Sequence, residues 1–120
     1  MLTLVIGFIG LISMQAQNAA EFNFDSETFN FGKIPQGTPV THDFKFTNTG
    51  SEPLIISEVK SSCGCTVPTY PKTPVKPGEA GTISVTYNAA AVNPFTKTVT
   101  IRSNTKTPVK VLYIKGEVIK

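Results

Sequence analysis

The residues of this chain best suited to chemistry are its two cysteines, Cys63 and Cys65, which flank Gly64. On an extended strand, residues two apart point to the same side with Cα atoms about 7 Å apart, at the limit for a disulfide. Gly64 lets the backbone tighten and close the small ring. Two thiols at this spacing predict a local disulfide, a redox pair that attacks and resolves partner disulfides, or a low-coordinate Cu(I) site.

We favour the local disulfide and keep the redox pair, the metal site and intermolecular pairing as alternatives. For a ring of three residues, the loop-entropy expression gives a stabilisation of only about 1.6 kcal/mol, so the disulfide adds little to the stability of the fold. Redox chemistry needs a thiolate, and the sequence shows no clear feature that would lower the pKa of either thiol. Lys60 is the nearest cation in sequence, and no helix N-terminus is expected there. A thioredoxin-like enzyme would also carry C-x-x-C within an α/β pattern, which this sequence lacks.

Other residues that bind metals or catalyse reactions are few. A closed structural zinc site needs four ligands, and beyond the cysteines the chain has one histidine, His42, with Met1 and Met14 in the N-terminal leader. His42 lies on the inward-facing parity of its strand and is expected to form a hydrogen bond there rather than to bind metal. Glu79 follows a turn, where a carboxylate commonly caps backbone amides. We therefore predict no catalytic residue outside the cysteine pair, no cofactor and no resident metal.

The N-terminal segment, residues 1–20, contains no Asp, Glu, Lys or Arg. Its apolar core, residues 2–12, is shorter than the roughly 20 residues of a spanning helix and is typical of a secretory signal peptide. We predict cleavage after Ala16, with Ala19 or Ala20 as second choices. The remainder is then exported to the periplasm or to the extracellular space or cell surface, where disulfides persist. It meets the membrane only through the transient signal peptide.

The remaining chain, residues 21–120, is long enough for one domain with one core. Acidic residues concentrate in residues 21–59 and basic residues in 60–120, and the formal net charge of the whole chain is +3. The lysines and arginines are dispersed among threonines and valines, without a compact basic run or an aromatic platform. This pattern argues against a nucleic-acid partner.

Apolar residues recur with a period of two, and turn residues interrupt this pattern about every 8–12 residues. The pattern predicts an all-β, immunoglobulin-like Greek-key sandwich of about seven strands. The expected strands cover residues 21–24, 29–31, 38–48, 54–60, 82–88, 95–103 and 109–119, with an irregular proline-rich crossover at 68–81. A parity slip between Ile56 and Val59 predicts a bulge. The expected core contains Val40, Phe44, Phe46, Ile83, Val85, Tyr87, Val99 and Ile101.

Two asparagines occur where strands meet turns. Asn48 ends the strand expected over residues 38–48, and Asn104 follows the strand expected over residues 95–103. Local hydrogen bonds of the Asx type, from the side chain to the nearby backbone, account for both residues without a functional role.

Several motifs occur together along the length of the chain. They are Phe29-x-Phe31-Gly32-x-Ile34, Phe44-x-Phe46-x-Asn48-x-Gly50, Ser62-Cys63-Gly64-Cys65-Thr66, Pro77-Gly78-Glu79-x-Gly81 and Gly116-x-Val118. In these motifs the chain resembles the bacterial family of exported proteins catalogued as domain of unknown function 1573, which is common in Bacteroidota. That family is similar to the immunoglobulin-like major sperm protein and hydin-type domains. The resemblance implies this fold and export, and it implies no biochemical activity.

The sequence therefore predicts an exported, non-enzymatic immunoglobulin-like module that binds a protein or a polysaccharide or serves as a scaffold. The alternative is a periplasmic thiol-redox protein or copper carrier that uses the Cys63-Gly64-Cys65 pair. The two differ in where function lies, because a binding module uses loops, a sheet face or a sheet edge, whereas a redox protein or carrier needs accessible sulfur.

Overall fold

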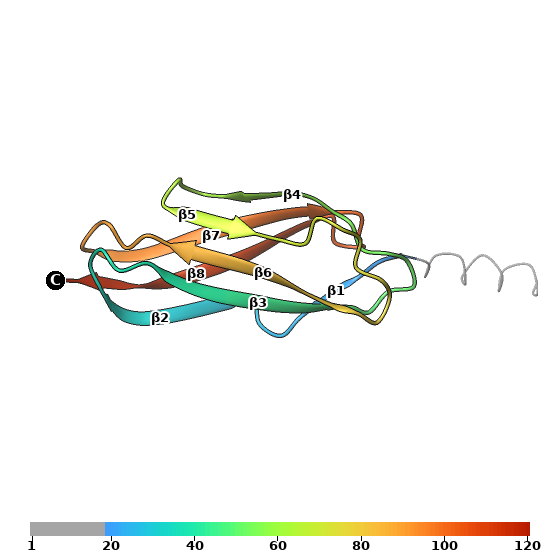
Figure 1. Ribbon diagram of the computed structural model, residues 1–120, viewed down its shortest axis with the longest axis horizontal. Coiled ribbons are helices and arrows are strands. Elements are labelled where there is room, and N and C mark those ends of the chain that lie inside the picture. The colour runs from blue at the N-terminus through green and yellow to red at the C-terminus, as the bar shows by residue number, and fades with distance from the viewer. Residues whose placement is uncertain (1–18) are drawn as a thin grey trace, which may run out of the picture.

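The computed structural model describes residues 19–120, so almost all of the predicted signal peptide lies outside the described residues. The described chain forms two packed four-stranded sheets (Figure 1). No helix long and apolar enough to cross a membrane occurs in this part of the chain. The strands are β1 (Phe22–Phe24), β2 (Thr28–Pro35), β3 (Val40–Asn48), β4 (Ile56–Ser61), β5 (Thr66–Thr69), β6 (Ala80–Tyr87), β7 (Pro94–Ser103) and β8 (Val109–Ile119).

The strand order is β1-β3-β6-β5 in the first sheet and β2-β8-β7-β4 in the second sheet. Neighbouring strands pair antiparallel, except that β2 runs parallel to β8. The predicted all-β, immunoglobulin-like sandwich is confirmed, with eight strands where about seven were expected. The predicted bulge is also present, because the pairing of β4 with β7 shifts between Ile56 and Glu58.

The additional strand is β5, which includes the start of the segment that we predicted to be irregular from residue 68 to 81. It pairs with β6 from Thr66 opposite Tyr87 to Thr69 opposite Ser84. Pro68 is compatible with this pairing because β5 is an edge strand, where one side of the backbone has no neighbour to bond. The expectation of an irregular segment was therefore wrong at its first two residues, and also at its last two, Ala80 and Gly81, which belong to β6.

Side chains from the inner faces of both sheets form one core. Of the predicted core residues, all are buried except Val40, which is half-buried. Val40 is the first residue of β3, at the end of the sheet, where fewer side chains cover it. The core also contains residues of β2, β7, β8 and the turns that lie outside the predicted set: Ile34, Leu54, Val75, Ala89, Phe95, Leu112, Ile114 and Val118.

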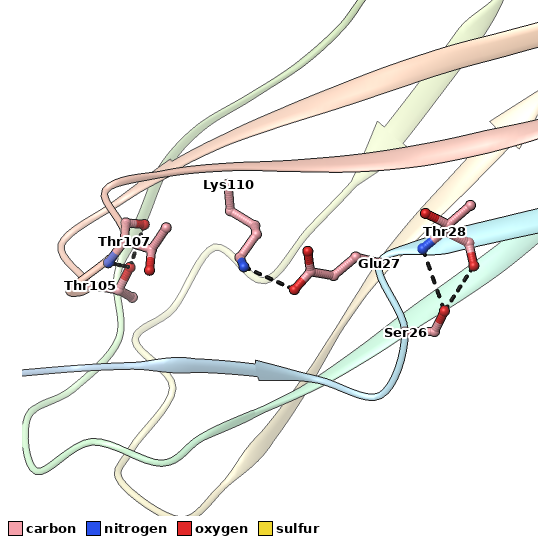
Figure 2. Close-up of polar contacts among 6 residues, drawn as sticks. All are labelled: Ser26, Glu27, Thr28, Thr105, Thr107 and Lys110. Atoms are coloured by element: carbon pink, nitrogen blue, oxygen red, sulfur yellow. Dashed lines mark hydrogen bonds and ion pairs between the residues drawn. The ribbon is translucent and has the colours of Figure 1, made fainter.

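The chain passes from the first sheet to the second between β1 and β2, and this connection is fastened to β8 (Figure 2). The Ser26 hydroxyl donates to the Thr28 carbonyl at 2.8 Å and closes a tight turn. The Glu27 carboxylate lies 2.9 Å from Lys110 Nζ. The Glu27 carbonyl accepts a hydrogen bond from the Tyr113 N–H at 2.9 Å. These contacts hold β2 in its parallel register on β8.

One end of the sandwich, which we call the entry end, consists of residues 19–20 and the turns at residues 48–55, 75–79 and 103–108 (Figure 1). Ala20 is 1% exposed and bridges Thr105. The Ala19 carbonyl accepts from the Ser51 N–H at 2.9 Å, and the Ala20 carbonyl accepts from the Lys106 N–H at 3.1 Å. The first described residues are therefore integral to the fold.

Close packing at the entry end leaves no room for a side chain at Gly50. A Cβ placed there would lie 2.7 Å from Ala20 Cα and would also collide with the Ala19 carbonyl oxygen. On the far side of the same end, the Thr105 hydroxyl donates to the Thr107 carbonyl at 2.7 Å and shapes the turn before β8 (Figure 2). The turn at Gly50 therefore packs directly against Ala19 and Ala20, and the turn at Thr105 forms a bridge with Ala20.

Asn48 lies at the centre of the entry end with an exposed fraction of 0%. Its side-chain oxygen accepts hydrogen bonds from the N–H groups of Glu21 and Gly50 at 3.2 and 3.0 Å. Its amide donates to the carbonyls of Glu52 and Val75 at 2.8 and 2.9 Å. The local Asx bond that we expected is present, and the side chain also joins segments distant in sequence.

Asn104 differs from expectation more strongly. Its side-chain oxygen accepts from the Ile55 N–H at 2.8 Å, and its amide donates to the Pro53 carbonyl at 2.9 Å. The interpretation as a local Asx residue was wrong, because these bonds tie the turn before β8 to the segment before β4. An Asx motif and a long-range clamp use the same side-chain atoms, so the sequence alone does not distinguish them.

Candidate functional site

The two cysteines lie in the loop that carries the chain from β4 in the second sheet to β5 in the first, and we call residues 62–65 the crossover loop. The Ser61 hydroxyl donates to the Cys63 carbonyl at 2.7 Å, and the Thr66 N–H donates to the same carbonyl at 3.3 Å. This turn brings the Cα atoms of Cys63 and Cys65 to 5.3 Å, within the range that a disulfide spans, and their sulfurs are bonded in the structure.

The cysteine pair is half-buried, and its closest polar neighbour is the hydroxyl of Thr66. Thr66 Oγ1 lies 3.8 Å from the sulfur of Cys63 and 3.8 Å from the sulfur of Cys65. The Cys65 carbonyl accepts from the Asn88 N–H at 3.0 Å, which anchors the loop beside the end of β6.

For the alternative of a metal site at Cys63 and Cys65, the fold brings no further ligand from the described residues close to the two sulfurs. Among residues 19–120, no three His, Cys, Asp or Glu residues lie close enough together to hold a metal ion. His42 stacks on Phe29 with ring centroids 3.8 Å apart and meets the edge of Phe44 at 4.6 Å. In place of the hydrogen bond that we expected, its ring is surrounded by aromatic contacts.

The environment of His42 changes its titration. Burial lowers the pKa of His42 below its ordinary value of 6.5, and the neighbouring Asp43 carboxylate acts in the opposite direction. The native packing therefore favours the neutral ring, which stacks on Phe29 without the cost of burying a charge. Since its ring lies between aromatic side chains, His42 acts as a structural residue.

Beside the crossover loop, the outer face of the second sheet contains a polar pocket of about 250 Å³, which we call the β4–β7 pocket. The Ser62 hydroxyl accepts from the Thr98 N–H at 3.1 Å and joins the two strands at one side of it. At the other side, Arg102 Nε lies 3.3 Å from Glu58 Oε1. The lining consists of two cations, one carboxylate and four hydroxyl residues: Glu58, Lys60, Ser61, Ser62, Thr98, Thr100 and Arg102.

This pocket was not predicted from the sequence. A signal was present, since Glu58 and Lys60 are two positions apart on β4 and point to one face, and Ser62 directly follows that strand. Their partners on β7 could not be identified, because the pairing depends on a register that is shifted by the bulge in β4.

Next to the pocket, β8 presents exposed apolar side chains on the same outer face. Val109 and Tyr113 are 46% and 42% exposed. Tyr113 is the cross-strand partner of Thr98, and Val109 is that of Arg102, so both lie beside the pocket. Ile119, which is 39% exposed, lies beyond the end of β7, with Lys115 and Glu117 between it and Tyr113. We call the pocket together with Val109 and Tyr113 the β8 face.

The outer face of the first sheet is different. There the Thr41 and Thr86 hydroxyls bond each other at 2.8 Å, and the Ser84 hydroxyl donates to the Asp43 carboxylate at 2.6 Å. Polar side chains on this face therefore satisfy one another across β3 and β6. On the β8 face, by contrast, Lys60 has no ion-pair partner among residues 19–120, and the side chains of Val109 and Tyr113 are exposed.

A family model described as "Protein of unknown function (DUF1573)" matches residues 22–118. No curated protein matches the chain. Among solved structures, a protein of unknown function from Porphyromonas gingivalis W83 is similar, with a TM-score of 0.74 and 16% identity. The match covers 85% of this chain and 48% of that one, so this chain spans about half the length of that protein.

Two further similar structures contain PapD-like or chaperone domains. PapD-like domain 7 of human CEP192 has a TM-score of 0.71 and 9% identity, covering 85% of this chain and 87% of that one. The CsuC–CsuE chaperone–tip adhesion subunit pre-assembly complex of Acinetobacter baumannii has a TM-score of 0.59 and 12% identity, covering 82% of this chain and 57% of the matched one. At these identities the likeness shows the fold alone.

Proposed function

The chain belongs to the DUF1573 family of proteins of unknown function, and we propose that it is an exported, non-enzymatic immunoglobulin-like binding module. The observation that carries this proposal is the β8 face. The exposed side chains of Val109 and Tyr113 lie beside the polar pocket on a sheet that no other described element covers. An uncovered face with both apolar and charged groups is typical of an interaction surface.

Two further observations support export and binding. The charge-free apolar segment at residues 1–20 has the composition of a signal peptide, which supports export from the cytoplasm. The fold is similar to that of a chain in the chaperone–tip adhesion subunit pre-assembly complex described above, which supports binding to another protein. The partner proposed here is a macromolecule, protein or polysaccharide, that contacts the β8 face.

Site-specific photo-crosslinking in the native host tests this function. A benzophenone amino acid at Tyr113, which is 42% exposed, inserts into C–H bonds of any macromolecule that covers the β8 face. The matched control carries the same group at Val67, which is 57% exposed in β5 of the first sheet. We expect a light-dependent adduct from position 113 and none from position 67. Equal adducts at both positions, or none at 113, would contradict the proposal.

A thiol-redox role is the second candidate, favoured by the Thr66 hydroxyl 3.8 Å from each sulfur. In this role, a thiolate of a partner dithiol attacks one sulfur of the Cys63–Cys65 bond. That bond breaks, a mixed disulfide forms and the other cysteine leaves as a thiolate. The second partner thiolate then attacks the mixed disulfide, so the partner is oxidised by two electrons and the Cys63/Cys65 pair is reduced.

Intact-mass analysis after thiol alkylation distinguishes this role from an inert disulfide. One portion of the protein, taken from its native compartment, is alkylated immediately to record the redox state of the Cys63/Cys65 pair in the cell. A second, unalkylated portion is equilibrated in glutathione buffers and alkylated only afterwards, which gives the reduction potential. A pair that is partly reduced in the cell, with a potential well above about −300 mV, supports redox chemistry. A fully oxidised pair with a potential below that value places the bond among structural disulfides.

A further inference from the structure

We propose that the β4–β7 pocket binds the carboxylate-bearing sugar ring of an acidic polysaccharide; this inference rests on the binding function proposed above and specifies its ligand. The charges of the lining residues are the first reason. Lys60 and Arg102 contribute two positive charges against one negative charge from Glu58. The pocket therefore has a net positive charge and attracts an anion.

The second reason is the state of the hydrogen-bonding groups. The Glu58 carboxylate pairs with Arg102 Nε at 3.3 Å and orients the guanidinium group. The two terminal NH2 groups of Arg102 are then available to bind a ligand carboxylate in a bidentate manner. Within residues 19–120, Lys60 has no ion-pair partner, and the hydroxyls of Thr98 and Thr100 bond no other side chain. These groups together offer donors to a carboxylate and both donors and acceptors to sugar hydroxyls.

The third reason is size and shape. A volume of about 250 Å³ lies below the roughly 300–1,000 Å³ of sites that enclose drug-sized ligands. The pocket is therefore suited to one ring of a chain and not to a whole oligomer. Thr98 of the pocket lining pairs with Tyr113 on β8. A sugar ring adjacent to the bound one can lie against the exposed face of this tyrosine.

A polysaccharide fits this face better than a peptide. Anchoring residues of protein partners enter apolar, desolvated pockets, and this pocket is lined by charges and hydroxyls. Hydroxyl groups from Ser61, Ser62, Thr98 and Thr100 match the many hydroxyls of a sugar, whereas an acidic peptide would use only the two cations. The predicted class of ligand is thus a polymer of uronic acids or another sugar acid.

The test is a titration of the purified, isotope-labelled protein with polygalacturonate, followed by amide chemical shifts and by calorimetry. Neutral dextran, poly-glutamate and inorganic sulfate are the comparison ligands. We expect polygalacturonate to shift the amides of Lys60, Thr98 and Thr100 and to bind at least about tenfold more tightly than each comparison ligand, since it alone combines the carboxylate with sugar hydroxyls. Amide shifts locate the site in the unaltered protein.

Matched variants then separate a specific site from general attraction. Lys60→Gln and Arg102→Gln should each weaken polygalacturonate binding about tenfold, the loss of one charge-assisted hydrogen bond. Lys45→Gln removes the same charge from the outer face of the first sheet and should change binding less than about twofold, as expected for a distant surface charge. Equal losses in all three variants would overturn the proposal, because they would show attraction by net charge alone.

Other outcomes also decide the question. Equal binding of poly-glutamate would assign the face to acidic peptides, and equal binding of sulfate would show a general oxyanion site; each contradicts the sugar-acid ligand. No binding of polygalacturonate at millimolar concentration would contradict it as well. If the crosslink from position 113 nevertheless captures a protein, the binding function stands and only the assignment of the ligand fails.

Discussion

The two regions at which the chain is fastened, the entry end and the crossover loop, are held by different means. At the entry end, one buried amide, that of Asn48, makes four hydrogen bonds to backbone groups of four residues. In the crossover loop, a covalent bond closes a ring between Cys63 and Cys65, which are only two positions apart. A hydrogen-bonded side chain that joins distant segments constrains this fold more than a covalent bond that joins near neighbours.

Replacement of Asn48 should have the largest effect. Asn48→Ala leaves two N–H groups and two carbonyls without their partner, and each unsatisfied buried group costs about 1–3 kcal/mol. Because water reaches part of this end, we expect a loss of at least about 3 kcal/mol, seen in chemical denaturation as a lower midpoint. Asn23→Ala, at an exposed position of β1, is the control and should change stability by less than about 0.5 kcal/mol. A loss for Asn48→Ala as small as this control would remove the contrast between the two regions.

The start of the mature chain should have the next largest effect. A protein that begins at Glu21 lacks the Ala19 and Ala20 carbonyls that accept from Ser51 and Lys106, and it lacks the buried Ala20 side chain. Two hydrogen bonds and one buried methyl group amount to about 2 kcal/mol. Compared with a protein that begins at Gln17, it should melt at a lower temperature.

The same packing bears on the cleavage site of the predicted signal peptide. Cleavage after Ala16 keeps residues 19 and 20, whereas cleavage after Ala20 removes them from the fold. We expect the mass of the exported protein to show Gln17 as its first residue. A mature protein beginning at Glu21 with full thermal stability would show that the entry end does not need these residues.

Removal of the disulfide should have a smaller effect. The double variant Cys63→Ser/Cys65→Ser should lose no more than about 1.6 kcal/mol, because the ring that the bond closes is so short. The hydrogen bonds of the turn, from Ser61 and Thr66 to the carbonyl of residue 63, remain possible in the variant. Thermal unfolding followed by circular dichroism measures the difference. A variant that is unfolded at room temperature would reverse the ranking of the two regions.

Protonation of His42 should have the smallest effect. Burial lowers the pKa of His42 in the native state, so the unfolded chain binds a proton more readily than the folded chain does. The resulting stabilisation is fully present above about pH 6.5 and is lost as pH falls through the lower pKa of the folded state. We expect denaturant midpoints of the wild type to decrease across this range relative to His42→Phe, which keeps an aromatic ring against Phe29. A difference independent of pH would show that the ring does not titrate differently on folding.

The fold was largely predictable because period-two patterns directly reflect which face of a strand is buried. β8 was predicted with its observed bounds, Val109–Ile119, and the bulge in β4 followed from the parity slip after Ile56. β5 was not predicted as a strand, because Pro68 removes a donor and only the position at a sheet edge makes that tolerable.

The candidate site was less predictable than the fold. The cysteine pair is adjacent in sequence, so its proximity could be derived from local geometry. The β4–β7 pocket combines residues about 40 positions apart, and it exists only because Glu58 pairs with Arg102 and Lys60 pairs with Thr100. Likewise, the role of Asn104 depends on Ile55 and Pro53, which are 49 and 51 residues away. Such contacts depend on strand register, which a single sequence does not specify.

The parallel pairing of β2 with β8 has a consequence for the order in which the protein folds. The ion pair at this connection joins Glu27 to Lys110, 83 residues apart, and the second sheet has no partner for β2 until β8 is present. The nascent chain therefore cannot complete the second sheet before β8 is synthesised. Contacts of such long range also form slowly. We expect folding of the sandwich to follow synthesis of β8 and not to accompany synthesis of the earlier strands.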